Sequence, residues 1–327
     1  MVKQTILRTS WLVLFVVFFM LSGCGGGGGG GSDSSSSGVG TAGVAVDPYI
    51  KGAVFEEVSP EGVVLQTSTA SDATGSFSFA KAVKDDSIIR IKEGYKGTHV
   101  GKPYEGSLRG TIEASGNLVV SPITTLLANG FTNEQVIALL EQAGISGLQE
   151  SDLYADSMAD LVGKQVFSDD ELILLQANIA VNNFLVRIDN FSWGPNDAGD
   201  VDLLAETVDM VQHCLNWNRY QSVRDELNTT LADFTEPLTA DHLIGAATIL
   251  VETVTLRARD GDIADPVAEA EALDGSLAEL ALHYYVQENR GDVAIEEAVS
   301  YGILPDISAN QYPHVDPAGD ISIYTEA

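Results

Sequence analysis

The chain has 327 residues, with 17 Lys and Arg against 47 Asp and Glu, which gives a formal net charge of −30. A polyanion of this kind is not expected to bind nucleic acid, because the phosphate backbone is held by clustered cations. Two Cys residues without any paired Cys/His spacing exclude a disulfide framework, a c-type haem and a structural zinc site. The length and the hydrophobic content of 45% predict a folded chain of two domains.

The amino terminus has the pattern of a secretory signal peptide. Lys3 and Arg8 precede an uninterrupted apolar run of eleven residues, 11–21. A helix that spans a bilayer needs about 20 apolar residues, so this run is too short for a membrane span. Residues 1–23 are therefore predicted to be a cleaved signal peptide.

The predicted cleavage site carries the sequence Leu21-Ser22-Gly23-Cys24, which resembles the lipobox of bacterial lipoproteins. The resemblance implies that Cys24 becomes the first residue of the mature chain and carries a diacylglycerol on its thiol. Two or three acyl chains hold a protein on a membrane that one chain holds only marginally. Gly25 stands where some bacteria place an Asp that retains lipoproteins in the inner membrane, which favours the outer membrane of the cell envelope. The alternative is a cleaved secretory signal with an incidental Cys.

Residues 24–43 have the composition of a flexible tether. Seven consecutive glycines follow Cys24, and the rest of the segment is mostly Ser and Gly. Such a stretch cannot bury apolar surface and is expected to behave as a random coil that spans about 25 Å.

Charge divides the remaining chain near residue 122. Residues 44–122 hold eight Lys and Arg against ten Asp and Glu, whereas residues 123–327 hold seven against 36. This change coincides with a change of hydrophobic period, so we expect one domain over 44–122 and an acidic domain over 123–304. Residues 305–327 contain three prolines and little periodicity, which predicts an extended tail.

The first domain is predicted to be all-β. Ser76-Phe77-Ser78-Phe79 alternates with period two, which places both rings on one face of a strand. Ile89 alternates with Arg90 in the same way. Short runs separated by turn residues predict strands in an antiparallel sandwich, at 50–58, 63–69, 76–80, 87–92, 104–114 and 117–121.

Three motifs of this domain resemble the carboxypeptidase-regulatory-like or transthyretin-like module of bacterial surface lipoproteins. They are Gly52-Ala53-Val54, the Thr-x-x-Asp-x-x-Gly-x-Phe-x-Phe stretch of residues 69–79, and Val119-Val120-Ser121-Pro122-Ile123-Thr124-Thr125-Leu126. The resemblance implies an Ig-like, prealbumin-like sandwich of the carbohydrate-binding-like folds, often used as a spacer. Related modules sometimes bind Ca²⁺ after the first strand, but residues 56–62 lack alternating Asp and Asn, so no calcium site is inferred there.

The second domain is predicted to be an all-α bundle of six to eight helices. Thr132 and Gln135 form a capping-box pattern before an apolar stripe, and Ser168 and Glu171 form another. The helix after Ser168 carries two apolar stripes and is therefore expected to be central. Further apolar stripes begin at Val201 and Leu243, and Asp265-Pro266 opens another helix.

Two loops of the acidic domain offer carboxylates that suit Ca²⁺, although neither has the full EF-hand pattern. They hold Asp197, Asp200 and Asp202, and Asp260, Asp262 and Asp265. Asp200 and Asp265 serve equally well as helix N-caps, which is the alternative. Asp152, Asp156 and Asp160 recur every four residues, as on one solvated helix face.

A loop of the β domain combines aromatic and polar side chains between glycines. Tyr95, His99 and Tyr104 in this loop could stack on and hydrogen-bond a sugar, and an ordinary connecting loop is the alternative. His213 and Cys214 are neighbours, but adjacent side chains on a helix diverge by about 100°, so Cys214 is interpreted as a partly buried structural thiol.

The preferred hypothesis is a lipid-anchored cell-envelope protein in which a β-sandwich spacer presents an acidic helical domain for structural or binding work. The expected partners are a membrane through the lipid anchor, and an envelope protein or a glycan. No cofactor is expected beyond the Ca²⁺ considered above, and no catalytic motif nominates active-site residues. The alternatives are a carbohydrate-binding surface module and an uncharacterised metal-dependent enzyme in the helical domain.

Overall fold

The computed structural model describes residues 40–113, 116, 118–197, 199–230, 237–288, 311–315 and 321–325. Residues Gly38–Ala327 form one compact unit. The predicted signal peptide, Cys24 and most of the predicted tether lie outside the described residues.

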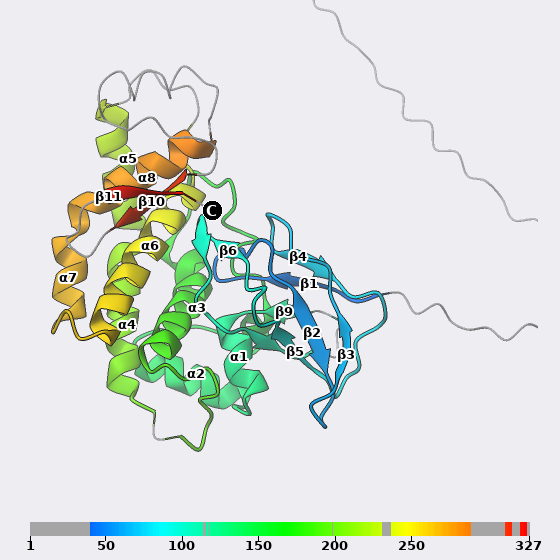
Figure 1. The fold of residues 1–327 in the computed structure, drawn as a ribbon. Helices are drawn as coiled ribbons and strands as arrows, with labels where there is room; N and C mark the ends of the chain where they lie inside the picture. The colour runs from blue at the N-terminus through cyan, green and yellow to red at the C-terminus, as the bar shows by residue number, and fades with distance from the viewer. Residues whose placement is uncertain are drawn as a thin grey trace, which may run out of the picture. The chain divides into compact units, whose positions relative to one another are not determined.

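The first part of this unit, the sheet-rich region, contains the strands between residues 42 and 120 (Figure 1). One sheet has the order β4-β1-β9, in which β1 pairs antiparallel with β4 and parallel with β9. A second, antiparallel sheet has the order β3-β2-β5-β8, and β6 and β7 form a separate hairpin. The strands are β1 (Ala42–Ala45), β2 (Phe55–Val58), β3 (Val64–Thr67), β4 (Ser76–Ser78), β5 (Ile88–Ile91), β6 (Thr98–His99), β7 (Lys102–Pro103), β8 (Arg109–Gly110) and β9 (Val119–Val120).

The period-two pattern of the sequence positions the core of this region. Phe77 and Phe79 are buried while Ser76 and Ser78 are exposed, as predicted. Phe77 stacks on Phe55 of the other sheet with ring centroids 4.3 Å apart. The two rings thus join the two sheets, because the burial of each large apolar side chain lowers the free energy of the folded state.

The second part, the helical region, begins directly after β9 (Figure 1). Its elements are α1 (Pro122–Ala128), α2 (Asn133–Gln142), the 3₁₀ helix η1 (Asp152–Tyr154), α3 (Asp169–Arg187), α4 (Val201–Cys214), α5 (Trp217–Thr230), α6 (Ala240–Arg259), α7 (Pro266–Ala272) and α8 (Asp274–Glu288). The capping boxes predicted at Thr132 and Ser168 are confirmed at the starts of α2 and α3.

Helices α3 and α6 occupy the middle of the helical region. Both are buried over most of their length, which confirms the central position predicted for α3. Within the part of the chain that the structure describes, none of the helices is long and apolar enough to cross a bilayer.

The predicted fold class, an all-β sandwich followed by an all-α bundle, is wrong, because the described chain is a mixed α/β unit. Val46 and Val119 of the sheet-rich region belong to the same apolar core as the helices. Val119 and Val120 form β9, and Ser121 then caps α1 with Pro122 in its first turn, so the motif expected to close the sandwich supplies both the last strand and the first helix. Helices that share their core with residues of the sheet-rich region cannot be assigned to a separate all-α bundle.

The carboxy-terminal tail contributes a second departure from the predicted fold class. β10 (Gln311–Val315) pairs antiparallel with β11 (Ile321–Thr325), and β10 packs against α6 and α8. The sequence of residues 305–327 has three prolines and little hydrophobic periodicity, which had predicted only an extended tail.

Candidate functional site

The most unusual chemistry of the described chain is a cluster of charged side chains buried where the sheet-rich region meets α6. His99 Nε2 lies 2.5 Å from Glu252 Oε1, and Lys102 Nζ lies 2.6 Å from Glu252 Oε2. The side chains of His99 and Glu252 are only 1% and 8% exposed. One carboxylate of α6 therefore has a side-chain nitrogen from each strand of the β6–β7 hairpin within ion-pair distance. We call His99, Lys102, Glu252, Asp47 and Tyr104 the buried cluster.

Tight backbone geometry holds the hairpin in place. Gly97 has φ +75°, and a Cβ atom there would lie 2.3 Å from the carbonyl oxygen of Lys51. This close approach lets Thr98 and Lys51 exchange two backbone hydrogen bonds of 2.8 Å. The hydroxyl of Tyr284 in α8 donates to the carbonyl oxygen of Val100, 2.6 Å away, so the tip of the hairpin is tied to the helical region as well.

The electrostatics of Glu252 favour its charged form. Burial by itself raises the pKa of this carboxyl, but the charges and hydrogen bonds of His99 and Lys102 outweigh it and lower the pKa to about 2. His99 also presents Nδ1 to the backbone carbonyl oxygen of Asp47, 2.6 Å away. Both ring nitrogens of His99 therefore lie close to oxygen atoms.

Asp47 behaves in the opposite way. Its side chain is buried, and burial together with the nearby charge of Glu252 raises the pKa of its carboxyl well above the usual value. The two carboxyl groups thus have pKa values that are driven apart. Groups with such shifts gather at functional sites, and also in buried structural networks.

Tyr104 connects the cluster to α3. Its hydroxyl donates to Asn182 Oδ1 over 3.0 Å, and both side chains are buried. The ring of Tyr104 packs edge-on against His99 with centroids 4.9 Å apart. The cluster therefore makes contact with α3, α6 and the hairpin at once.

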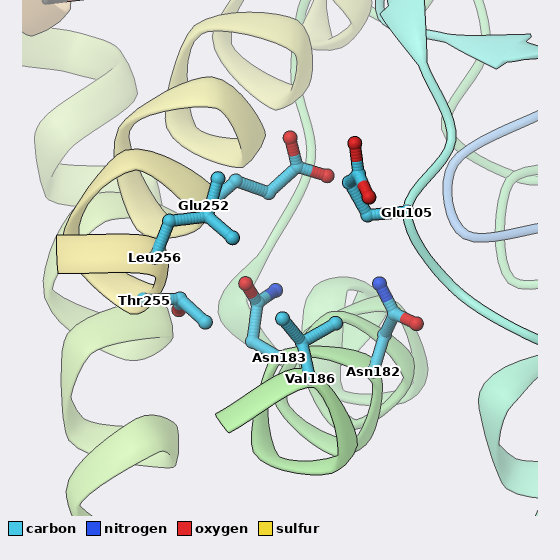
Figure 2. A pocket seen from close by; sticks show the side chains of 7 residues that line it. All are labelled: Glu105, Asn182, Asn183, Val186, Glu252, Thr255 and Leu256. Carbon is cyan, nitrogen blue, oxygen red and sulfur yellow. The ribbon is translucent and has the colours of Figure 1, made fainter. Parts of the chain in front are cut away.

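A small cavity lies beside Glu252 (Figure 2). Its lining side chains come from α3, α6 and the segment after β7, namely Glu105, Asn182, Asn183, Val186, Glu252, Thr255 and Leu256. The carboxylates of Glu105 and Glu252 face each other across it in Figure 2. The space open to the centre of a water-sized sphere is about 10 Å³, close to the minimum for one water molecule.

The residues predicted for sugar binding do not share an open surface. His99 and Tyr104 are each 2% exposed, whereas Tyr95 is 55% exposed and lies under Lys92, whose Nζ is 4.7 Å from the ring centroid. The aromatic and polar side chains of this loop had suggested a sugar-binding surface, but two of the three are buried.

The six aspartates predicted as metal ligands are spread over separate loops and caps. Asp200 accepts from the backbone N–H of Leu203 and Asp265 from that of Ala268, so both are the N-caps considered as the alternative. Asp197 accepts from the backbone N–H of Gly194, 2.5 Å away. Asp202 lies in the first turn of α4, Asp260 ends α6 and pairs with Arg259, and Asp262 is exposed. No group of three or more His, Cys, Asp or Glu side chains in the described segments is arranged to hold a metal ion.

Two further sequence expectations concern the three aspartates spaced four residues apart and the neighbouring residues His213 and Cys214. Asp152 lies in η1 and Asp156 follows it in irregular chain, where Asp156 accepts from the hydroxyl of Tyr49 over 2.8 Å, so the three aspartates do not share a helix face. Cys214 is buried, and His213 pairs with Asp274 over 2.8 Å. Burial raises the pKa of the Cys214 thiol to about 12, which suits a structural thiol.

The sequence patterns did not nominate Glu252, Asp47 or Asn182. Two signals were present: Glu252 is the only Asp, Glu, Lys or Arg between Asp241 and Arg257, and Asn182-Asn183 interrupts the most apolar stretch of α3. Buried polar residues inside apolar helices are costly unless they have partners, so such interruptions indicate a buried contact.

Comparison with known protein families, with curated proteins and with solved structures finds no match to this chain.

Proposed function

We propose that this chain is a lipid-anchored protein of the bacterial cell envelope, placed at the outer membrane, whose mixed α/β body does structural or binding work. The amino-terminal charges, the short apolar run and the Leu21-Ser22-Gly23-Cys24 motif support the anchor. The glycine-rich segment after Cys24 supports a body that stands off the lipid surface on a flexible tether.

The observation that carries the role of the body is the pairing of His99 and Lys102 with Glu252. Glu252 and its two partners form a buried polar contact that joins the sheet-rich region to the middle of α6. Breaking such a buried contact leaves an unpaired charge, so the two regions are expected to move as one body. A rigid body on a flexible tether suits a protein that presents a surface to a partner.

The charge distribution indicates what kind of partner that surface would meet. Residues 123–327 hold 36 Asp and Glu against seven Lys and Arg. Such a field repels polyanions and anionic lipids and attracts cations, so the partner of the helical region is expected to be a basic protein surface or a cationic polymer.

The anchor is tested by replacing Cys24 with Ser in the full chain and by separating membrane and soluble fractions of the cells. We expect the Cys24→Ser variant in the soluble fraction and the unsubstituted chain in the membrane fraction. Mass spectrometry of the unsubstituted chain should find acyl chains on Cys24. Cys214→Ala is the matched control, because it removes the other thiol and should stay with the membrane. An unmodified Cys24, or Cys24→Ser still on membranes, contradicts the proposal.

A further inference from the structure

Strand β3 forms one edge of the four-stranded sheet β3-β2-β5-β8. Within the described residues β3 pairs with β2 alone. Gln66, near the end of β3, exchanges side-chain hydrogen bonds with the backbone of Lys81, whereas no strand lies on the other side of Val64 and Leu65. An unpaired edge of this kind is a ready template for a strand from another chain.

The side chains of this edge are unusually apolar for a solvent-facing strand. Val63, Val64 and Leu65 are 57%, 43% and 37% exposed, and they follow one another in the sequence. Proteins usually protect an exposed edge with a charge, a proline or a strong bulge. The pairing of β3 with β2 shifts register at Leu65, but residues 62–71, Gly-Val-Val-Leu-Gln-Thr-Ser-Thr-Ala-Ser, contain no charged residue and no proline.

The position of β3 and the distribution of charge together favour a second copy of this chain as the partner strand. In Figure 1, β3 lies on the side of the sheet-rich region that is away from the helices. Residues 44–122 carry a net charge of −2, from eight Lys and Arg against ten Asp and Glu. An antiparallel pair of β3 strands would bring these nearly neutral regions together and hold the two acidic helical regions at opposite ends, where salt screens their repulsion.

We propose that β3 is a homodimer interface, in which two copies pair their β3 strands antiparallel about a two-fold axis. The contact is then isologous: each copy contributes the same strand, and the sheet continues from one copy into the other. The exposed aliphatic side chains of both strands would cover one another across the axis. This proposal does not depend on the lipid anchor.

Single cysteines placed along the edge test the pairing in the full chain. Each position from 63 to 68 is replaced by Cys in turn, the protein is oxidised, and disulfide-linked dimers are measured. In an antiparallel pair about a two-fold axis, only positions at the axis meet their own copy, so dimer yield should peak at one or two adjacent positions. Val166→Cys, at a residue of the helical region that is 69% exposed, and the unsubstituted chain are the controls. If the yield of disulfide-linked dimer is no higher than in these controls at every position, the proposal is overturned. The same oxidation is done in whole cells, where a cross-link from β3 to a different protein also overturns it.

A charge substitution gives an independent readout of the same interface. Leu65→Lys places a cation opposite or diagonal to its own copy, so light scattering should change from a dimer mass to a monomer mass. Because Leu65 is already partly in water, the melting temperature should stay close to that of the unsubstituted chain. Val166→Lys, an equally drastic change at an exposed site, should remain dimeric. An unsubstituted chain that stays monomeric at every concentration measured contradicts the proposal.

Discussion

His99 Nε2 and Glu252 Oε1 lie 2.5 Å apart and join the β6–β7 hairpin to the middle of α6. The contact connects two segments that are far apart in the sequence, and Lys102 completes it from the second strand of the hairpin. This relationship is the main polar link between the sheet-rich and helical regions, and its energetics can be measured directly.

Replacing Glu252 with Gln should destabilise the protein strongly. The substitution removes the negative charge and leaves His99 and Lys102 beside a neutral amide, and breaking a buried ion pair costs about 3–5 kcal/mol. The free energy of unfolding at neutral pH, measured by urea denaturation, should fall by that amount. Glu141→Gln is the matched control on an exposed face of α2 and should change the stability by less than about 0.5 kcal/mol.

Comparison of the unsubstituted chain with Glu252→Gln at several pH values also tests the lowered pKa of Glu252. A carboxyl whose pKa falls from 4.5 to about 2 on folding stabilises the folded state above pH 4.5 and loses that contribution as the pH falls toward 2. The stability difference between the unsubstituted chain and Glu252→Gln should therefore shrink over this window. A difference that stays constant from pH 6 to pH 3 would contradict the role assigned to the ion pair.

Asp47→Asn should show the opposite dependence on pH. Burial raises the pKa of Asp47 well above 3.8, so its contribution to stability is fully present below that value and is lost as the pH rises. Asparagine does not titrate, so the stability of the variant relative to the unsubstituted chain should increase between about pH 4 and pH 7. Urea denaturation at several pH values measures the free energy of unfolding of both proteins. If the stability of Asp47→Asn relative to the unsubstituted chain stays constant or falls as the pH rises, the raised pKa of Asp47 is contradicted.

Gly97→Ala should cost much more than Gly94→Ala, although both glycines have a positive φ, of +75° and +77°. Alanine in this backbone region costs about 1–2 kcal/mol at either site. At Gly97 the new Cβ would also meet the backbone of Lys51 and Ala53, whereas nothing lies within 4 Å of it at Gly94. Overpacking should add about 1–3 kcal/mol at Gly97 alone. Thermal unfolding of the two variants checks this ranking, and equal losses would contradict the close approach.

Cys214 should resist alkylation until the protein unfolds. Burial raises the pKa of its thiol to about 12, and only the thiolate reacts. Relative to a thiol with the ordinary value of 9.0, the thiolate fraction near pH 8 is about 1000-fold smaller. Iodoacetamide labelling followed by mass spectrometry should show slow modification in buffer and fast modification in urea. Rapid labelling of the folded chain would show that the thiol is accessible.

Short-range sequence patterns predict the local structure of several strands and helices. Alternation placed Phe77 and Phe79 inside, and the capping patterns at Thr132 and Ser168 fixed the starts of two helices. These features depend on residues within a few positions of one another, where strand and helix periods act directly. The signal-like segment and Cys24 belong to the same kind of local pattern and stay predictions.

The way the two regions combine, and the place where their charged residues meet, depend on contacts between segments far apart in the chain. The two regions were expected to be separate domains, but Val46 and Val119 pack into the helical core, and α1 follows β9 after the single cap residue Ser121. His99 had been expected on an open loop with Tyr95, yet its partner is Glu252, in a helix much later in the chain. A carboxylate buried in an apolar helix is stable only if cations reach it from elsewhere in the fold, and the distance along the chain between such partners leaves no periodic signal in the sequence.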